Sequence, residues 1–151
     1  MTHRPSRDAL ALALRRYVSR RITNDQLDSV AVDWRDRGAV AVQGMAWRLY
    51  DDMYTHKAVG KHRLSPAARH EIARWVAFLH SSQEYAWPEY NLIHVTPGIG
   101  SLLTFGWWGR KEARRWREFT EAGDFDVWPF IDRRSELEAR SAPRFMASGD
   151  A

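Results

Sequence analysis

A histidine follows two aspartates at helical spacing in the segment LYDDMYTHK (49–57). Asp52 and His56 are four residues apart, so a continuous helix would place both side chains on one face, with Asp51 beside them. A carboxylate and an imidazole that meet in a pocket can act as a general acid–base pair. The same spacing is typical of a solvated helix end, where a protonated histidine suits the helix dipole. The sequence favours this second interpretation and leaves Asp51, Asp52 and His56 as weak acid–base candidates.

Other patterns that carry chemistry are missing from the sequence. The chain has no cysteine, which excludes a disulfide framework, a thiol nucleophile and cysteine-ligated zinc or iron–sulfur sites. Its six histidines show no HExxH or comparable metal-binding spacing, and the GIG at 98–100 is not followed by the GK[ST] of a phosphate-binding loop. We therefore expect no catalytic residue, no metal and no cofactor. The sequence favours a protein without catalytic activity but does not exclude an enzyme.

Basic residues form a second candidate surface. The chain carries 23 Lys and Arg against 19 Asp and Glu, and its sequence pI is about 9.8. If two basic helices adjoin, they would form a basic patch of Arg15, Arg16, Arg20, Arg21 and Arg114. Three glutamates between 112 and 121 dilute the later part of this patch. The pattern therefore predicts only weak, non-specific nucleic-acid binding that disappears by about physiological salt.

A long uncharged segment forms the third candidate surface. No Asp, Glu, Lys or Arg occurs from 90 to 109, and the segment ends in Trp107 and Trp108 directly before Arg110 and Lys111. Tryptophan and arginine are the residue types that dominate binding hot spots, so these four residues are the candidate partner-binding site. Trp beside basic residues is also typical of a membrane interface, which makes a peripheral membrane contact through 90–110 the alternative.

Helices must position these side chains, and several start signals are present. Ser6 can cap a first helix, and TNDQ (23–26) is a capping-box pattern for a second helix from Asn24 to about Trp34. Ser65 before Pro66 is typical of another helix start. No segment alternates like a strand. The pattern predicts about five to six helices, with the main ones starting at 6, 24, 39, 66 and 110, the third of them running to 56, and a short last helix over 135–140.

Two Trp-Pro pairs, Trp87-Pro88 and Trp128-Pro129, predict how the loops attach to this helical core. Proline keeps the preceding residue out of the helical region, so each indole can lie flat on neighbouring helices. We interpret both tryptophans as loop anchors; an aromatic groove for a partner is the alternative. The tryptophans predicted to be largely buried are Trp34, Trp47, Trp75, Trp87, Trp116 and Trp128.

Length and composition indicate a single domain. At 151 residues the chain can bury a sufficient core without disulfides or metal. We expect one compact helical domain over 1–141, a frayed tail over 142–151, and a monomer or a weak dimer. The N-terminal segment lacks the pattern of a signal peptide. Together with the absence of cysteine, this favours a cytoplasmic protein.

The segments LYDDMYTHK (49–57), ARWVAFLHSSQEYAWP (73–88) and RRWREFTEAGDFDVWPF (114–130) resemble a family of small uncharacterised bacterial proteins. The resemblance implies a bacterial, intracellular, single-domain protein and assigns no residue a role. The leading functional prediction is an accessory protein, for example an immunity-like factor, that binds another bacterial protein without catalysis. A weakly basic nucleic-acid-associated protein and a peripheral membrane protein are the alternatives.

Overall fold

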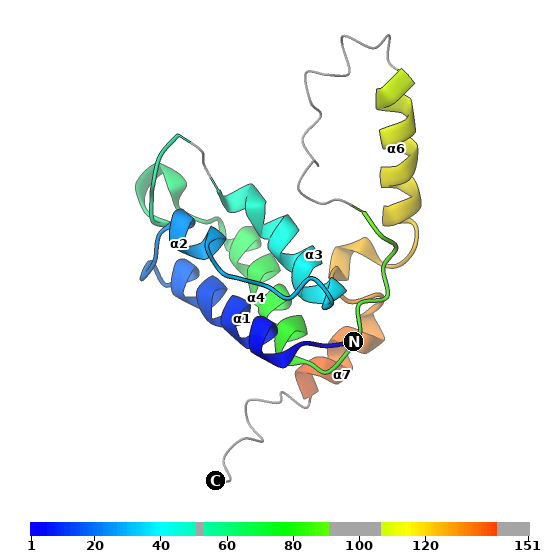
Figure 1. Ribbon diagram of the computed structural model, residues 1–151, viewed down its shortest axis with the longest axis horizontal. Coiled ribbons are helices and arrows are strands. Elements are labelled where there is room, and N and C mark those ends of the chain that lie inside the picture. Colours follow the sequence, from blue (N-terminus) through cyan, green and yellow to red (C-terminus); the bar gives the residue numbers. More distant parts are fainter. Residues whose placement is uncertain (51–52, 91–106, 142–151) are drawn as a thin grey trace.

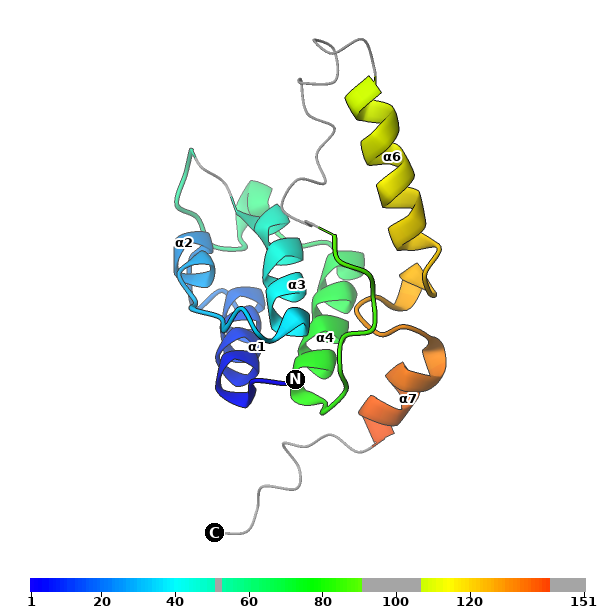
Figure 2. The ribbon, with the colours of Figure 1, turned by 45° about the vertical axis from the view of Figure 1, so that its right-hand side comes forward.

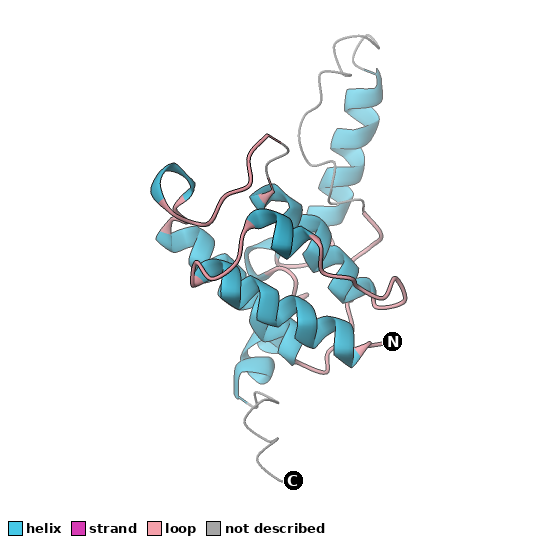
Figure 3. Cartoon of the chain, turned by 60° about the vertical axis from the view of Figure 1, so that its left-hand side comes forward, coloured by secondary structure: helices cyan, strands magenta, loops and turns pink. Residues whose placement is uncertain are grey.

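The computed structural model describes residues 1–50, 53–90 and 107–141 (Figure 1). Its α-helices are α1 (Arg4–Val18), α2 (Asn24–Asp28), α3 (Arg37–Ala46), α4 (Pro66–His80), α6 (Trp107–Thr120) and α7 (Arg133–Ser141). The short 3-10 helices of the described residues are η1 (Trp47–Leu49), η2 (Gly60–His62) and η4 (Phe125–Val127). The described residues contain no strand (Figure 3). The prediction of a mainly α-helical, compact fold is confirmed.

Helices α1 and α4 form the centre of the fold and run in opposite directions. The Arg4 guanidinium, at the start of α1, donates to the backbone oxygens of Leu79 (2.7 Å) and Ser81 (2.6 Å) at the end of α4. α3 contacts both helices, and α7 contacts α4. α6 projects upward on the side of α3 and α4 that lies away from α1 (Figures 1 and 2). The fully buried side chains of this centre include Leu10, Leu14, Tyr17, Ile72, Trp75 and Leu79.

Local capping chemistry explains where the helices begin. Thr23 and Gln26 form the complete capping box at the start of α2, and Ser65 caps α4 directly before Pro66, as predicted. The predicted cap of the first helix, Ser6, was three residues late, because α1 begins at Arg4 with His3 as its N-cap. Ser6 instead lies buried inside the first turn.

Both Trp-Pro tryptophans are buried loop anchors, as predicted. The Trp87 side chain is 0 % exposed, and its indole Nε1 donates to the backbone oxygen of Phe130 (3.1 Å). Trp128 is also buried; its Nε1 donates to the hydroxyl of Tyr85 (3.1 Å), and its ring meets Trp75 edge-on at a centroid distance of 6.0 Å. The Trp128–Pro129 peptide bond is cis. The two anchors hold the loops after α4 and α6 against the core.

Two expectations about length were wrong. The second helix stops at Asp28 rather than near 34, and the helix predicted over 39–56 is α3, which ends at Ala46 before the short turn η1. Trp47 explains the early end of α3: its indole donates to the Asp28 carboxylate (2.7 Å), and its ring stacks on Tyr50 at 5.9 Å. These contacts hold the aromatic residues against α2 at the surface instead of in the core.

The burial of the tryptophans was predicted only in part. Trp75, Trp87 and Trp128 are buried, and Trp116 is half-buried. Trp34 and Trp47 contradict the prediction, since they are 78 % and 41 % exposed. Trp34 lies in a turn beyond the end of α2, and no helix covers it there. The surface around this exposed indole is therefore a candidate binding site.

Candidate protein-binding surface

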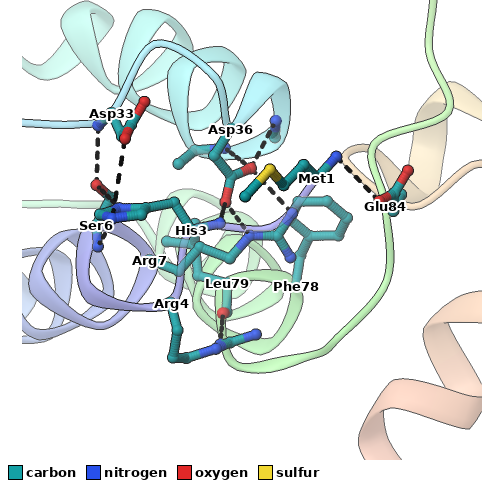
Figure 4. A network of polar contacts seen from close by, with 12 residues as sticks. Met1, His3, Arg4, Ser6, Arg7, Asp33, Asp36, Phe78, Leu79 and Glu84 are labelled. Carbon is teal, nitrogen blue, oxygen red and sulfur yellow. Dashed lines mark hydrogen bonds and ion pairs between the residues drawn. The ribbon is translucent and has the colours of Figure 1, made fainter.

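A buried ion pair organises the surface around Trp34 (Figure 4). Arg7 of α1 and Asp36, directly before α3, are each 1 % exposed, and the guanidinium donates to both carboxylate oxygens at 2.7 and 3.0 Å. The remaining Arg7 nitrogen donates to the backbone oxygens of Gln83 (2.9 Å) and Ser81 (3.3 Å). Such two-pronged, fully satisfied pairing is what makes a buried charge tolerable.

Asp36 also acts as the cap of α3. Its Oδ1 accepts from the backbone N–H groups of Gly38 and Ala39, both at 3.1 Å, and its Oδ2 accepts from the N–H of His3 at 2.8 Å. Burial raises the pKa of the Asp36 carboxyl, but the hydrogen bonds from Arg7, His3 and Ala39 and the charge of Arg7 outweigh burial and hold the pKa below its ordinary value. Asp36 is therefore a charged structural group at neutral pH.

The free energy of unfolding is expected to fall when the pH drops through the folded-state pKa of Asp36. A carboxyl whose pKa is lower in the folded than in the unfolded state contributes stability above its unfolded pKa, about 4, and loses it below. Urea unfolding between about pH 7 and pH 3 measures this loss. The Asp36→Asn variant lacks the titrating group, so its stability is expected to change less over the same range. An equal pH dependence of the two proteins would contradict the assignment.

The turn that carries Trp34 is fixed at both ends. The Asp36 N–H donates to the Asp33 oxygen (3.0 Å), and the Arg35 N–H donates to the Asp33 carboxylate (2.9 Å). The Asp33 N–H donates to the hydroxyl of Ser6 (2.8 Å), which joins the turn to α1 (Figure 4). The Arg35 guanidinium lies 5.6 Å from the centre of the Trp34 ring, within the range of a cation–π contact. The backbone of the turn is thus held in place while its indole points outward.

Trp34 separates two grooves. The first, the α3 groove, has a volume of about 460 Å³ and runs between α3 and the loop after Trp87. Its lining includes Trp34, Arg37, Val40, Tyr85, Tyr90 and Arg115. The second groove, of about 450 Å³, lies between the turn and the start of α1, where His3, Pro5 and Arg35 line it. We call these two grooves with Trp34 between them the Trp34 surface.

The residue types of the Trp34 surface are those found in binding surfaces. Trp, Tyr and Arg are the residue types that carry most of the energy in protein interfaces, and all three line the α3 groove. Val40 adds apolar surface, being 42 % exposed. Burial raises the pKa of the Tyr85 hydroxyl far above its ordinary value, which outweighs the hydrogen bond from Trp128 and the charge of Arg37, so Tyr85 does not ionise near neutral pH.

The predicted partner-binding residues lie elsewhere. Trp107, Trp108, Arg110 and Lys111 form the first turn of α6, which begins three residues earlier than predicted. Lys111 is exposed, and the side chains of the other three lie outside the described part of the structure. The uncharged segment before them, 91–106, also lies outside the described residues. These four residues therefore stay a prediction, separate from the Trp34 surface.

The predicted basic patch is split by the fold. Arg15, Arg16, Arg20 and Arg21 lie exposed at the end of α1. Arg114 lies on α6, which the two views place on the other side of α3 and α4 (Figures 1 and 2). It pairs there with Glu118 at 2.8 Å. The condition that the two basic helices adjoin is therefore not met.

The predicted acid–base pair is not arranged on a helix. His56 lies in a loop and not on α3, so the spacing argument that joined it to Asp52 fails. Asp51 and Asp52 lie outside the described residues. The His56 ring stacks instead on the His62 ring, with a centroid distance of 3.7 Å and an interplanar angle of 8°. Within 1–50, 53–90 and 107–141, no group of three or more His, Asp or Glu side chains could hold a metal ion.

Sequence reasoning missed Trp34 because its pattern resembled a helix. The capping box at 23–26 was followed by spaced apolar residues, which led to a helix reaching 34. A local signal against this helix is the sequence DWRD (33–36), since Asp33 and Asp36 both favour turns and caps. Asp36 two residues before Gly38 is also a typical helix start. These residues define the turn that exposes Trp34.

Comparisons with known proteins add no functional residue. Among the described residues, no helix has both the length and the apolar character needed to cross a membrane. No protein-family model, no curated protein and no solved structure matches this chain. The Trp34 surface is thus the site that the structure itself supplies.

Proposed function

We propose that this chain acts by binding another bacterial protein through the Trp34 surface, as a cytoplasmic accessory or immunity-like factor that is monomeric or weakly dimeric when free. The exposure of Trp34, at 78 %, is the observation that carries the proposal. Trp34 is not alone in being exposed, but it is held outward on a fixed turn and joins two grooves, so its indole forms part of a larger surface of the kind that marks protein-interaction sites. Such surface is stabilising only where a partner covers it.

The fixed backbone makes the surface suitable for binding. The turn is held by hydrogen bonds from Asp36 and Arg35 and by the one to Ser6, so little backbone freedom is lost when a partner docks. Full burial of a Trp side chain removes about 150–250 Å² from water. Burial of this area is favourable, and only what remains after the entropic costs of association adds to the affinity. An apolar side chain of the partner fits the α3 groove beside Trp34, and Arg115 on its rim can pair with a carboxylate.

Replacing Trp34 by alanine is expected to abolish capture of the partner without unfolding the protein. The hot-spot range for truncating a central tryptophan is about 2–4 kcal/mol, equivalent to a loss of affinity of at least about thirtyfold. Tagged wild-type protein and the Trp34→Ala variant are compared in pull-downs from the bacterial host, and the proteins recovered are identified by mass spectrometry. Any partner found is then titrated against both proteins by calorimetry.

Leu137→Ala is the matched control, because Leu137 is 66 % exposed on α7, away from the Trp34 surface. A partner recovered by wild type and Leu137→Ala but lost with Trp34→Ala supports the proposal. Equal recovery by all three proteins contradicts it. A Trp107→Ala/Trp108→Ala double variant tests the start of α6 in parallel. If only that variant loses the partner, the interface lies on α6 instead.

A further inference from the structure

Two segments of the chain concentrate its positive charge. Residues 9–22 and 53–70 together hold eight of the 23 Lys and Arg residues, whereas all 19 Asp and Glu residues lie elsewhere. The exposed cations of these segments are Arg15, Arg16, Arg20, Arg21, Lys57, Lys61 and Arg63. The rest of the chain is therefore net negative. The formal charge of +4 hides a strong separation of charge along the sequence; in the fold, the Asp25 carboxylate reaches the second segment and accepts a hydrogen bond from the Thr55 hydroxyl.

The fold places these two segments side by side at one end of the α1–α4 pair. Asn24 joins them: its N–H donates to the His56 oxygen (2.9 Å), and its side-chain oxygen accepts from the His56 N–H (2.7 Å). The Asn24 amide also donates to the oxygen of Tyr54 (3.1 Å). The Tyr17 and His56 rings lie 6.5 Å apart. We call the surface of residues 15–21 and 54–63 the basic end; Figure 1 shows it beside α2.

Aromatic rings are exposed among these cations. Tyr54 is 61 % exposed, and the Lys61 ammonium lies 5.3 Å from the centre of its ring. The stacked rings of His56 and His62 line a groove of about 480 Å³, together with Tyr50 and Arg48. Face-to-face rings point their nitrogens sideways and not at a common point, so the pair is poorly arranged for a metal. Flat rings beside cations are instead the elements from which stacking platforms for bases are built.

One cation of the basic end is kept at a position that favours glycine. Arg20 has φ +64°, and it follows α1 where the Arg20 N–H donates to the Tyr17 oxygen (2.9 Å) and the Arg21 N–H to the Arg16 oxygen (2.8 Å). These two bonds form a Schellman motif, whose left-handed residue is usually glycine. A side chain at this left-handed position is destabilising. The arginine thus occupies this position at a local cost in stability.

We propose that the basic end binds single-stranded nucleic acid without sequence preference. The cations contact phosphates, and unpaired bases stack on Tyr54 and on the rings that line the groove. Exposed rings favour a single strand over a duplex, in which the bases are already stacked. An anionic membrane would also use the cations and the exposed Tyr54, so vesicles form one arm of the test below. This proposal is independent of the Trp34 surface, because α2 and the body of α1 separate the basic end from the turn at 33–36.

Fluorescence anisotropy with a labelled single strand of about 20 nucleotides, between about 50 and 200 mM salt, tests the proposal. Arg20→Gln/Arg21→Gln is expected to reduce the slope of log K against log salt by about 1.4, since each lost phosphate contact in a single strand contributes about 0.7. Tyr54→Ala is expected to weaken binding about fivefold or more. The matched control, Arg114→Gln/Arg117→Gln on α6, removes the same charge and is expected to leave the slope unchanged.

The Arg20→Gly variant distinguishes an effect on nucleic-acid binding from an effect on stability. Glycine fits the left-handed position better, so the midpoint of urea unfolding is expected to rise or stay unchanged while the affinity for the single strand falls. Reduced binding together with reduced stability would contradict the proposal. Equal effects of the two double variants, tighter binding of the duplex than of the single strand, or binding to phosphatidylserine vesicles in place of the oligonucleotide would each overturn it.

Discussion

Replacing Asp36 by asparagine is expected to lower the free energy of unfolding by about 3–5 kcal/mol, because it leaves a buried arginine without its counter-charge. The Arg7 guanidinium is 1 % exposed and cannot reach water without opening the junction of α1, α3 and α4. Asparagine can still accept from the amides of Gly38 and Ala39, so the cap of α3 survives in part. Its amide group, however, presents N–H donors to the N–H donors of Arg7 and His3.

Urea unfolding at neutral pH measures this loss, with Asp126→Asn as the control. Asp126 is an exposed aspartate, and its change is expected to shift the free energy of unfolding by less than about 0.5 kcal/mol. A typical domain has only about 5–15 kcal/mol in total, so Asp36→Asn is expected to leave a marginal protein. A loss below about 1 kcal/mol would mean that the buried Arg7–Asp36 ion pair does not hold the junction of α1, α3 and α4 together.

Replacing Trp87 by alanine is expected to lower the free energy of unfolding by about 3–5 kcal/mol as well, through a cavity rather than an unpaired charge. The Trp87 ring is 0 % exposed and packs on Phe119 and Phe125, at centroid distances of 5.2 and 6.0 Å. Together with Tyr90, which packs on Trp116 and Phe119, it joins the loop after α4 to the residues at the end of α6. Without it, the two segments lose both packing and the hydrogen bond to the Phe130 oxygen.

Two further variants separate these contributions. Trp87→Phe keeps a buried ring, so it leaves a smaller cavity together with a Phe130 oxygen that lacks its donor, and we expect a smaller loss of about 1–3 kcal/mol. Trp34→Ala removes a tryptophan that is 78 % exposed, and we expect a change within about 0.5 kcal/mol. Equal midpoints for Trp87→Ala and Trp34→Ala in urea would contradict the division of tryptophans into anchors and binding residues.

The parts of the fold that depend on local chemistry could be predicted from the sequence. A capping box needs only Thr23 and Gln26, and the start of α4 needs only Ser65 before Pro66. The effect of proline on the residue before it likewise indicated that Trp87 and Trp128 leave the helical path. Each of these signals acts within four residues, so no knowledge of the tertiary structure is required.

The features that involve distant residues could not be predicted. The end of α3 depends on Asp28, 19 residues before its partner Trp47. The turn that exposes Trp34 has a local signal in DWRD, but its attachment to α1 depends on the pairing of Arg7 with Asp36, 29 residues apart. A charged residue within a helix pattern is normally predicted to face solvent, so the sequence did not indicate that Arg7 is buried. Amphipathic spacing indicates which face of a helix is apolar but not which element covers it.

The candidate sites illustrate the same limit. The sequence identified Arg15, Arg16, Arg20 and Arg21 as basic, but it joined them to Arg114, which lies on another side of the molecule. The residues that do lie beside them, 54–63, come from a loop without regular periodicity. The hydrogen bonds of Asn24 bring that loop into place. No pattern along the chain predicts such a contact.

The pairing of α1 with α4 also has a consequence for synthesis on the ribosome. α1 ends at Val18, but the residues that bind its first turn, Leu79 and Ser81, are added about 60 residues later. At a rate of synthesis of about 5–20 residues per second, the apolar face of α1 stays uncovered for several seconds until α4 has been made. Contacts so distant in sequence must also overcome the entropy of closing a long loop. The nascent chain therefore depends on late-made residues to protect its first helix, and this delay is when chaperones would be expected to bind it.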